Sequence, residues 1–367
     1  MSQTATVAHA SLDRFRRTIV TSDLHGDLAG FRALLQKSGF SSKDALVIVG
    51  DLLEKGPQSL GLLRAVMELA QGGNVFVLAG NNDLLLSEWG RGEASDEDVW
   101  RYLRTRDTSV LMDMAQALER RWDTLEDVQA LKAAVWAAFQ PELRFLDALP
   151  HILDTEQCTF VHAGLGPGPL TEQDYEFCLT AKAFGRQPHR FEKPVIVGHW
   201  PCSNYYQPIV SVAPYWNRDT NVLSIDGGNQ LNRWGRINYL VLDGAEPECH
   251  GLDLYPKVRA LTPQAASEDP LTLEFPRTLV ELRETGPVET RCYFPELDRE
   301  LTIPSKQIYS YKGQTYCWNL TTYRLPVQAG DVLSCCALEP QGMLAIRGDT
   351  VGYYEGPYEP LPTDSTV

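Results

Sequence analysis

Six side chains of the kinds that bind metal ions recur between residues 23 and 199. Each stands at the end of a short run of Val, Ile, Leu or Phe, and each has a glycine close by: Asp23, His25, Asp51, Asn81, His162 and His199. Mixed carboxylate, amide and imidazole ligands suit manganese, iron or zinc better than calcium. An aspartate that serves two ions fits a two-metal site, in which the ions lie about 3.5–4 Å apart. These residue types predict a metal site if the chain brings them together.

The elements that must position these side chains are strands alternating with helices. Hydrophobic runs predict strands over residues 16–23, 45–51, 74–81, 157–164, 193–199, 221–228 and 237–244, and two amphipathic segments predict helices over 28–39 and 59–73. Because the runs are continuous rather than alternating, we expect strands that are buried on both faces. In a mostly parallel sheet, side chains just beyond the carboxyl ends of strands gather in one cleft. The fold class is therefore α/β.

The rest of the chain divides by composition. Residues 84–149 are helical and poor in strand patterns, which predicts a helical insertion within a domain of residues 17–260 that follows an N-terminal extension, 1–16. Small polar residues and prolines over 261–270 are typical of a linker. Residues 271–360 alternate short strands with Gly and Pro turns, which predicts a small all-β domain before a flexible tail, 361–367.

Charge and composition exclude several classes of function. The net charge of −15 argues against a nucleic-acid-binding surface and against docking to anionic membranes. No apolar run is as long as a membrane span, and the first twenty residues lack the apolar region of a signal peptide. The eight cysteines form no CxxC pair and stand mostly in strand-like runs. We therefore expect reduced thiols and a cytoplasmic protein.

Five motifs carry a resemblance to a known family. In chain order they are "DLHG", "GDLLEKG", "GNND", "VHAG" and "GHW", within residues 17–243. This series resembles the calcineurin-like metallophosphoesterase superfamily, whose patterns are DxHG, GDxxDRG, GNH(D/E), VHxG and GH. Within it, the motifs are most similar to those of phosphoprotein phosphatases and symmetrical diadenosine-tetraphosphate hydrolases. The resemblance implies a four-layered α/β/β/α fold that holds two divalent metal ions, with manganese as the expected metal and iron or zinc as alternatives.

The same resemblance implies roles for the six side chains. Asp23, His25 and Asp51 would hold one metal ion. Asp51 would bridge to the second, which the remaining three side chains would complete: Asn81, His162 and His199. A hydroxide between the two ions would attack phosphorus in line with the leaving group.

Two departures from the family pattern bear on catalysis. Glu54 and Lys55 stand where the family has Asp-Arg, and Asn82 stands where it has the histidine that helps to protonate the leaving group. Asn82 can hydrogen-bond to a phosphoryl oxygen but cannot act as a general acid, a loss that costs about 10²–10⁴-fold on a poor leaving group. Lys55 keeps a positive charge near the phosphate without arginine's bidentate geometry. Glu54 either holds Lys55 in place or is solvated.

Other candidate residues are less well defined. Arg186 and Arg190 lie where phosphoprotein phosphatases carry a second phosphate-binding arginine, with Arg186 the candidate that we carry forward, and a solvated charge is the alternative for both. Asp226 either orders a turn or contacts a ligand histidine. Three further histidines lie outside any motif: His151, His189 and His250. The tyrosines and the tryptophan of the C-terminal strands either pack in the core of the small β domain or form a surface for a protein partner.

Three hypotheses follow. The first is a two-metal phosphatase of the phosphoprotein-phosphatase type, acting on a phosphorylated protein or peptide and working best with good leaving groups, such as phosphotyrosine or aryl phosphates. The second is a hydrolase of dinucleoside polyphosphates such as diadenosine tetraphosphate. The third is a weakly catalytic module that binds phosphorylated ligands, with the C-terminal β domain as its partner surface.

Overall fold

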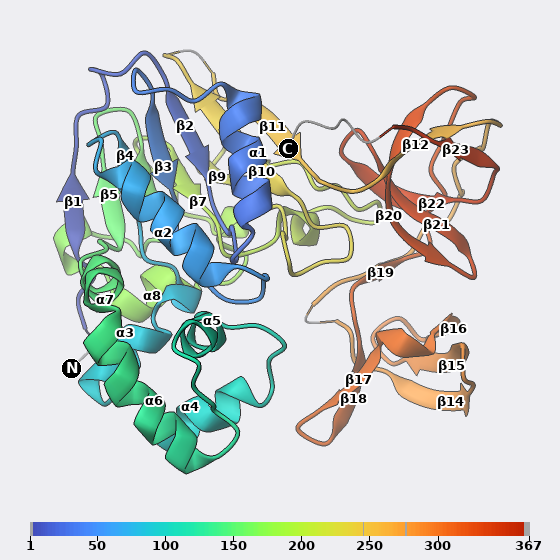
Figure 1. The fold of residues 1–367 in the computed structure, drawn as a ribbon. Coiled ribbons are helices and arrows are strands. Elements are labelled where there is room, and N and C mark those ends of the chain that lie inside the picture. Colours follow the sequence, from blue (N-terminus) through green and yellow to red (C-terminus); the bar gives the residue numbers. More distant parts are fainter. Residues whose placement is uncertain (1–2, 245, 276, 363–367) are drawn as a thin grey trace.

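Two β-sheets pack face to face in the first part of the chain (Figure 1). The computed structural model describes residues 3–244, 246–275 and 277–362. The first sheet has the order β11-β10-β2-β3-β4, formed by Glu248–Leu252, Ile237–Leu242, Thr18–Thr21, Ala45–Ile48 and Val75–Val77. Strands β2, β3 and β4 are parallel, while β10 is antiparallel to both β2 and β11.

The second sheet has the order β1-β5-β6-β7-β9-β8, and it is also mixed. Its strands are Val7–His9, Ile152–Asp154, Thr159–Val161, Val195–Val197, Val222–Ser224 and Tyr215–Asn217. Both sheets contain parallel pairs, while β10, β5 and β8 each run antiparallel to a neighbour. The predicted N-terminal extension also contains an edge strand, β1, which pairs with β5.

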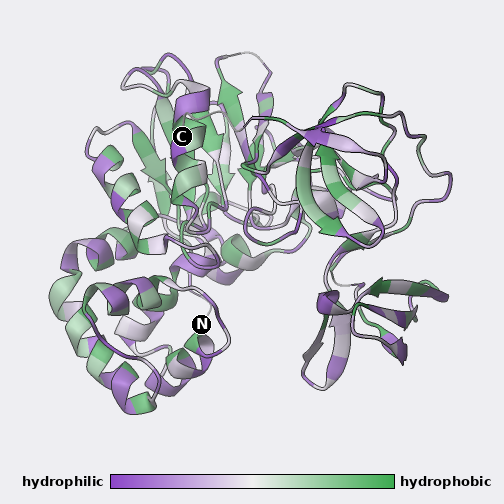
Figure 2. Ribbon diagram, turned by 45° about the vertical axis from the view of Figure 1, so that its right-hand side comes forward, coloured by the Kyte–Doolittle hydropathy of each residue, from purple (hydrophilic) through white to green (hydrophobic). Residues whose placement is uncertain are grey.

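Alternating side chains of the strands build the layers. In β2, Ile19 packs under helices α1 (Leu28–Ser38) and α2 (Ser59–Ala70), whereas Val20 packs between the two sheets against Phe160 and Ile196. A third cluster covers the outer face of the second sheet and includes Cys178 of α8 (Tyr175–Thr180). The predicted four-layered α/β/β/α class is confirmed, and Figure 2 shows mostly hydrophobic strands beside helices that carry both hydrophilic and hydrophobic residues.

A group of five helices follows β4 and lies below the sheets in Figure 1. They are α3 to α7, with the bounds Leu85–Arg91, Asp96–Leu103, Val110–Ala117, Leu125–Ala138 and Gln140–Asp147. Ser95 and Thr124 begin α4 and α6 with capping boxes. These helices lie within residues 84–149, the range of the predicted helical insertion, and they share their core with α2.

The C-terminal region is all β. Its larger sheet has the order β22-β21-β20-β12-β23, from Thr350–Tyr354, Gly342–Arg347, Val332–Glu339, Lys257–Ala260 and Tyr358–Pro360. Three smaller sheets follow. One pairs β13 (Thr272–Leu273) with β19 (Leu320–Thr321), and another pairs β17 (Ile308–Tyr311) with β18 (Gln314–Cys317). The third has the order β14-β15-β16, formed by Glu281–Thr285, Glu289–Phe294 and Arg299–Pro304.

Two features of this region differ from the sequence prediction. Strand β12 precedes the predicted boundary at residue 260, yet it pairs with β20 and β23 because Val258 and Ala260 face the core of that sheet. The larger sheet also shares a core with the first part of the chain, where Val210, Val212 and Trp234 pack against its strands. Residues 363–367 of the predicted tail lie outside the described part of the chain. Among the described helices, none has the length and apolar character needed to cross a bilayer.

Candidate metal centre

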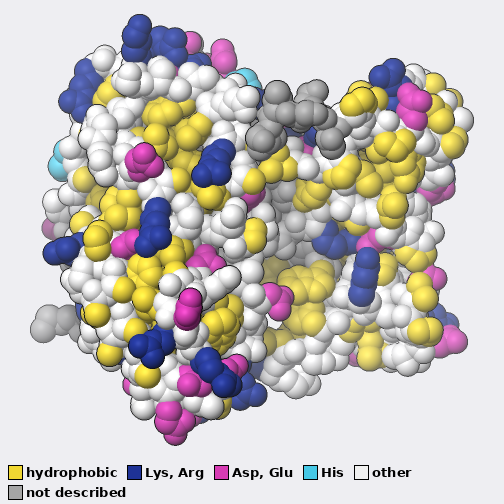
Figure 3. All heavy atoms as spheres, viewed as in Figure 1, with side chains coloured by type: hydrophobic (Ala, Val, Ile, Leu, Met, Phe, Trp, Pro, Cys, Tyr) yellow, Lys and Arg dark blue, Asp and Glu magenta, His cyan; other side chains and the backbone are white. Residues whose placement is uncertain are grey.

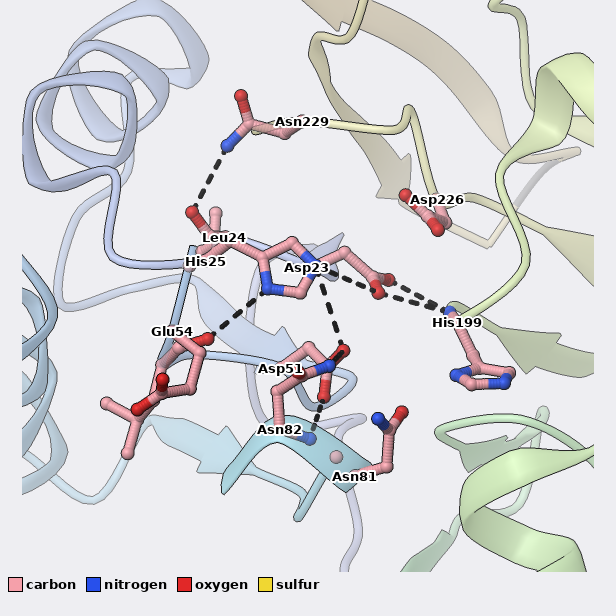
Figure 4. Close-up of polar contacts among 12 residues, drawn as sticks. Asp23, Leu24, His25, Asp51, Glu54, Asn81, Asn82, His199, Asp226 and Asn229 are labelled. Atoms are coloured by element: carbon pink, nitrogen blue, oxygen red, sulfur yellow. Dashed lines mark hydrogen bonds and ion pairs between the residues drawn. The ribbon is translucent and has the colours of Figure 1, made fainter. Parts of the chain in front are cut away.

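The six candidate ligands lie in the loops that follow five different strands (Figure 4). Asp23 and His25 come after β2, Asp51 after β3, and Asn81 opens a 3₁₀ turn after β4. His162 directly follows β6, and His199 follows β7. The two sheets thus bring residues that are far apart in the sequence to one edge of the sandwich.

The ligand atoms form two groups that share one carboxylate. Asp23, His25 and Asp51 make up one group, and Asp51, His162 and His199 the other, with potential ligand atoms within 4.8 Å of one another in each. Asp51 is central to both: His25 Nε2 lies 3.7 Å from its Oδ2, and His162 Nε2 lies 3.4 Å from its Oδ1. The amide oxygen of Asn81 is 3.1 Å from His162 Nε2. All six predicted ligands are therefore brought together.

Backbone carbonyls orient the imidazole rings. Nδ1 of His162 lies 2.9 Å from the oxygen of Val49, and Nδ1 of His25 lies 3.3 Å from the oxygen of Leu53. A proton on each Nδ1 leaves the Nε2 lone pair free for a metal ion, which is the usual arrangement of metal-binding histidines. His25 Nε2 is buried and has no hydrogen-bond partner among the described residues. A metal ion would satisfy this orphaned atom, so the site fits the predicted metal.

The protonation of the histidines also suits metal binding. Burial lowers the pKa of both His25 and His199 to about 3, and the charge of Lys55 adds to the effect on His25. Both rings are therefore neutral at pH 7, as ligation requires. Lys55 itself comes from the loop after β3.

The two aspartates place negative charge in a buried space. Burial, together with the charge of Asp51, raises the pKa of Asp23 well above its usual range. Burial would also raise the pKa of Asp51, but His162, His25 and Lys55 hold it below the usual value. The backbone N–H of His199 donates to both carboxylate oxygens of Asp23, at 3.2 and 3.0 Å. Bound cations would offset the cost of keeping both carboxylates charged here.

The backbone at these ligands adopts an uncommon conformation. Asp23, His25, Asp51 and His199 have φ values of 53°, 48°, 54° and 66°, in the left-handed region that residues other than glycine rarely occupy. Such residues cost about 1–3 kcal/mol each and cluster at functional sites. A glycine is needed at position 198, where an added Cβ would lie 2.3 Å from Asp23 Oδ2.

Asn82 contacts the shared ligand directly. Its backbone N–H donates to Asp51 Oδ1 at 2.8 Å, and its side-chain amide donates to Asp51 Oδ2 at 2.6 Å. The structure therefore gives Asn82 a partner that the sequence prediction of a phosphoryl contact did not include: Asn82 orients the carboxylate of Asp51, which belongs to both ligand groups.

Asp83 is a positioning residue that the sequence reasoning missed. It is 2% exposed and accepts the backbone N–H groups of Asp51, Leu53 and Gly80 at 2.9, 3.0 and 2.8 Å. These bonds fix the loops after β3 and β4 relative to each other. Burial raises the pKa of Asp83 to about 7, with the charge of Asp51 adding to the effect. Its position as the last residue of "GNND", where the family has Asp or Glu, was the available signal.

The predicted solvated state of Glu54 is wrong, because its side chain is 1% exposed. The carboxylate contacts the helical insertion. One carboxylate oxygen accepts from Ser109 Oγ at 3.0 Å and from the N–H of Val110 at 3.1 Å, at the start of α5, and the other accepts from Tyr102 Oη at 2.7 Å. Glu54 thus ties the loop that carries Lys55 to α4 and α5. Burial raises its pKa despite these three donors.

The two predicted phosphate-binding cations have different surroundings. The positive charge of Lys55 acts to lower the pKa of Asp23, Asp51 and His199, so Lys55 adds positive charge to the ligand cluster. Arg186 instead donates to the backbone oxygens of Asn204 and Tyr205 at 3.1 and 3.0 Å. Arg186 therefore holds the loop that follows "GHW", and its phosphate contact stays a prediction.

The remaining candidates lie outside the cluster. Asp226 accepts the N–H of Gly228 at 2.7 Å, which agrees with the turn-ordering alternative. Arg190 bonds to the backbone at residues 218 and 219. The three other histidines pack against aromatic rings, namely His151 with Tyr175, His189 with Phe191 and His250 with Tyr239. In the C-terminal region Tyr353 and Tyr354 are buried, whereas Tyr311 and Trp318 are 57% and 52% exposed.

Comparisons with known proteins agree with this geometry. The profile of the calcineurin-like phosphoesterase family matches residues 16–175. Symmetrical bis(5'-nucleosyl)-tetraphosphatase of Chromohalobacter salexigens is 34% identical over 146 residues, 38% of this chain and 51% of that protein. The enzyme of the same name from Psychromonas ingrahamii is 31% identical over 235 residues, 62% of this chain and 68% of that protein. The chain thus spans about half to two thirds of the length of these relatives.

Among solved structures, a putative diadenosine tetraphosphatase matches 68% of this chain and 99% of its own, with 20% identity and a TM-score of 0.45. The family profile and the relative from Psychromonas ingrahamii, taken with the buried ligand cluster, define the class: this chain belongs to the calcineurin-like phosphoesterase family. The resemblance predicted from the five motifs is confirmed. The presence of Asp and His side chains positioned for a metal ion is confirmed as well.

Proposed function

We propose that this chain is a metal-dependent hydrolase of phosphoanhydrides and that its substrate is a dinucleoside polyphosphate such as diadenosine tetraphosphate. The observation that carries the proposal is the absence of a suitable proton donor among the described motif residues. Asn82 stands where the family has histidine, and Glu54 is committed to Tyr102, Ser109 and Val110. The leaving group of an anhydride is a weak base that needs no protonation, so this site suits it.

Two divalent metal ions belong to the proposal. Asp23, His25 and Asp51 would hold one, and Asp51 would bridge to the second, completed by Asn81, His162 and His199. Manganese is the expected metal, with iron or zinc as alternatives, because the donors are mixed oxygen and nitrogen. When bound, the ions would supply Lewis-acid activation of the phosphoryl group and a nucleophile derived from water.

The residues around the ligands have distinct tasks in this proposal. Asn82 orients Asp51, and Lys55 neutralises charge on the phosphate chain as the nucleophile attacks. Glu54 is a positioning residue rather than a catalytic one, since its carboxylate contacts the helical insertion. Arg186 holds the loop at residues 204 and 205, and its contact with a phosphate of the substrate is part of the proposal.

The activities for which the two relatives are named support the nucleotide substrate over a phosphoprotein. Both relatives described above are symmetrical tetraphosphatases, and symmetrical cleavage of diadenosine tetraphosphate consumes one water and yields two ADP. A cytoplasmic location fits such a substrate, and it fits the eight cysteines, all of which are free thiols.

A phosphatase of phosphotyrosine or aryl phosphates is the second candidate. The same lack of a proton donor favours it, because a phenol of pKa about 10 leaves more readily than the hydroxyl of serine. The exposed Tyr311 and Trp318 would then serve a protein partner, as would also be expected of a module that binds phosphorylated ligands without turnover.

A product assay tests the proposal. Metal-depleted protein supplied with Mn²⁺ is expected to convert diadenosine tetraphosphate to ADP faster than it dephosphorylates phosphotyrosine or phosphoserine peptides. Faster turnover of the phosphotyrosine peptide would support the second candidate. Faster turnover of phosphoserine than of phosphotyrosine would refute the leaving-group argument, and full activity without added metal would refute the metal site. Binding without turnover of any substrate would leave the binding module as the correct description.

A further inference from the structure

An aromatic side chain of the C-terminal region lies beside the candidate metal centre. The ring of Phe275 is 6.1 Å from that of Trp200, with an interplanar angle of 58°. Trp200 directly follows the candidate ligand His199 in the chain. Phe275 nevertheless remains 49% exposed, so much of the ring is free for another contact. The C-terminal strands therefore contribute a residue to the rim of a site that the first part of the chain builds.

Phe275 is anchored on both sides. Its backbone N–H donates to Asn319 Oδ1 at 3.0 Å, and the amide of Asn319 donates to Asn232 Oδ1 at 3.2 Å, which links the C-terminal region to the loop after β9. On its other side, Glu274 is 2% exposed. The backbone of Phe275 is thus fixed, and the exposed face of its ring stays in water and adds nothing to folding. This combination is typical of a recognition residue, because little freedom is lost when a ligand binds.

A cation completes the same rim. The ammonium of Lys182 lies 5.5 Å from the centre of the Phe275 ring. The backbone oxygen of Cys178, four residues earlier, accepts the N–H of Ala163 at 2.8 Å, and Ala163 directly follows the candidate ligand His162. This bond ties the segment that leads into Lys182 to the loop that carries a candidate ligand. Within the described part of the chain, Lys182 makes no ion pair with a carboxylate. In a protein of net charge −15, an unpaired cation beside a phosphoester site is suited to an anionic group of the substrate.

The rim joins two parts of the molecule, because Trp200 and Lys182 belong to the first part of the chain and Phe275 belongs to the C-terminal region. Figure 3 shows a hollow between these two parts, with hydrophobic side chains along it. Because the Phe275 side chain is 49% exposed, a substrate longer than a single phosphate can reach its ring from solvent.

We propose that Phe275, Trp200 and Lys182 form a binding site for a nucleobase and its adjoining phosphate, and that Phe275 is a specificity-determining residue supplied by the C-terminal strands. The inference rests on the proposed function, because a base stacked on Phe275 needs a phosphate chain that reaches the metals. Aromatic rings stack on the face of any base, and each such contact contributes about 1–3 kcal/mol. Lys182 would pair with a phosphate while Phe275 holds the base.

Steady-state kinetics of F275A test the site, with F177A as the matched control. Phe177 is also an exposed phenylalanine, at 42%, but its ring packs on Phe184 in the first part of the chain. With Mn²⁺ present, F275A is expected to lower kcat/KM for diadenosine tetraphosphate by about 5- to 100-fold, chiefly through KM, as the loss of one stacked base predicts. Hydrolysis of inorganic tripolyphosphate, which has no base, should change less than twofold. F275W should retain most activity, and F177A should resemble wild type on both substrates.

The outcomes separate this inference from the proposed function. The base site is wrong, and the proposed function stands, if wild type cleaves diadenosine tetraphosphate and F275A cleaves it equally well. The same conclusion holds if F275A loses activity equally on diadenosine tetraphosphate and on tripolyphosphate. If F275A loses phosphotyrosine peptide while keeping the nucleotide, the ring serves an aryl phosphate and the nucleobase inference is overturned. If wild type cleaves no nucleotide, calorimetric titration with ADP decides: binding that F275A weakens supports the site, and equal or absent binding overturns it. Urea unfolding of F275A checks that the fold is intact.

Discussion

Removal of the Glu54 carboxylate should destabilise the protein through the helical insertion. In E54A, the hydroxyl of Ser109 and the N–H of Val110 lose their acceptor at the start of α5, and Tyr102 Oη loses its partner. A buried donor left without a partner costs about 1–3 kcal/mol. Ser109 and Val110 are buried, whereas Tyr102 is half-buried and can turn to water. Loss of a negative charge at a helix N-terminus adds about 0.3–1 kcal/mol.

These contributions are partly offset because E54A also removes a carboxylate whose burial is unfavourable, as its raised pKa indicates. We therefore expect E54A to lower the free energy of unfolding by about 3–5 kcal/mol. E54Q keeps an acceptor for Ser109 and Val110 and should cost about 1–2 kcal/mol. E97A is the matched control, since Glu97 lies on the adjoining helix α4 but is paired with Arg101 at the surface, and it should cost less than about 1 kcal/mol.

Urea unfolding followed by circular dichroism, in the same metal buffer for every variant, measures these differences. Y102F and the double variant E54A/Y102F complete a cycle in which the two losses should be non-additive by about 1–2 kcal/mol. Glu54 and Lys55 have φ values of 67° and 68°, so the loop should relax once its anchor is lost. E54A should therefore also lower kcat while metal content is unchanged. The anchoring role would be refuted if E54A unfolded at the same urea midpoint as E97A. It would also be refuted if the losses of stability in E54A and Y102F were additive.

The remaining predictions concern the shared ligand and a buried acid. D51N should abolish binding of both metal ions, because Asp51 belongs to both ligand groups, and plasma mass spectrometry measures the metal content. D44N is the control, since Asp44 is also buried but is paired with Arg16, and it should retain both ions. Equal metal content in D51N and wild type would contradict the shared site. Burial raises the pKa of Glu274 to about 8, and neither of its oxygens has a hydrogen bond of ordinary geometry among the described residues, although Arg186 and Arg277 lie near. In the unfolded chain the Glu274 carboxyl loses its proton near pH 4.3, about the ordinary value for glutamate. Between about pH 4 and 8 the unfolded chain therefore binds fewer protons than the folded chain. The free energy of unfolding consequently falls as pH rises through that window. In urea unfolding, E274Q and wild type should have the same free energy of unfolding at pH 5, and that of E274Q should be higher by about 1–3 kcal/mol at pH 9. An equal loss of stability in the two proteins between pH 5 and 9 would contradict this prediction.

Much of the candidate site could be predicted because its information is local. Hydrophobic runs end in Asp51, His162 and His199, and such runs form buried strands whatever else the chain does. Polar residues that follow such strands must lie at the edge of the sheet. The motif order then indicated the family, and the family indicated four layers. The helical segment was equally visible, since the periodicity of a helix lies within a few turns.

What the sequence by itself determined is thus the types of the ligands, their places at strand ends and the class of the fold. Only the tertiary structure decided what depends on packing between distant segments. In the folded chain, the Glu54 carboxylate accepts a hydrogen bond from Val110, 56 residues away. Strand β12 pairs in the C-terminal sheet, and Phe275 packs beside Trp200. The left-handed backbone at Asp23 was equally invisible, because it costs energy locally and persists only where many surrounding contacts hold it. Those contacts exist only once the whole chain has folded, so no local pattern encodes them.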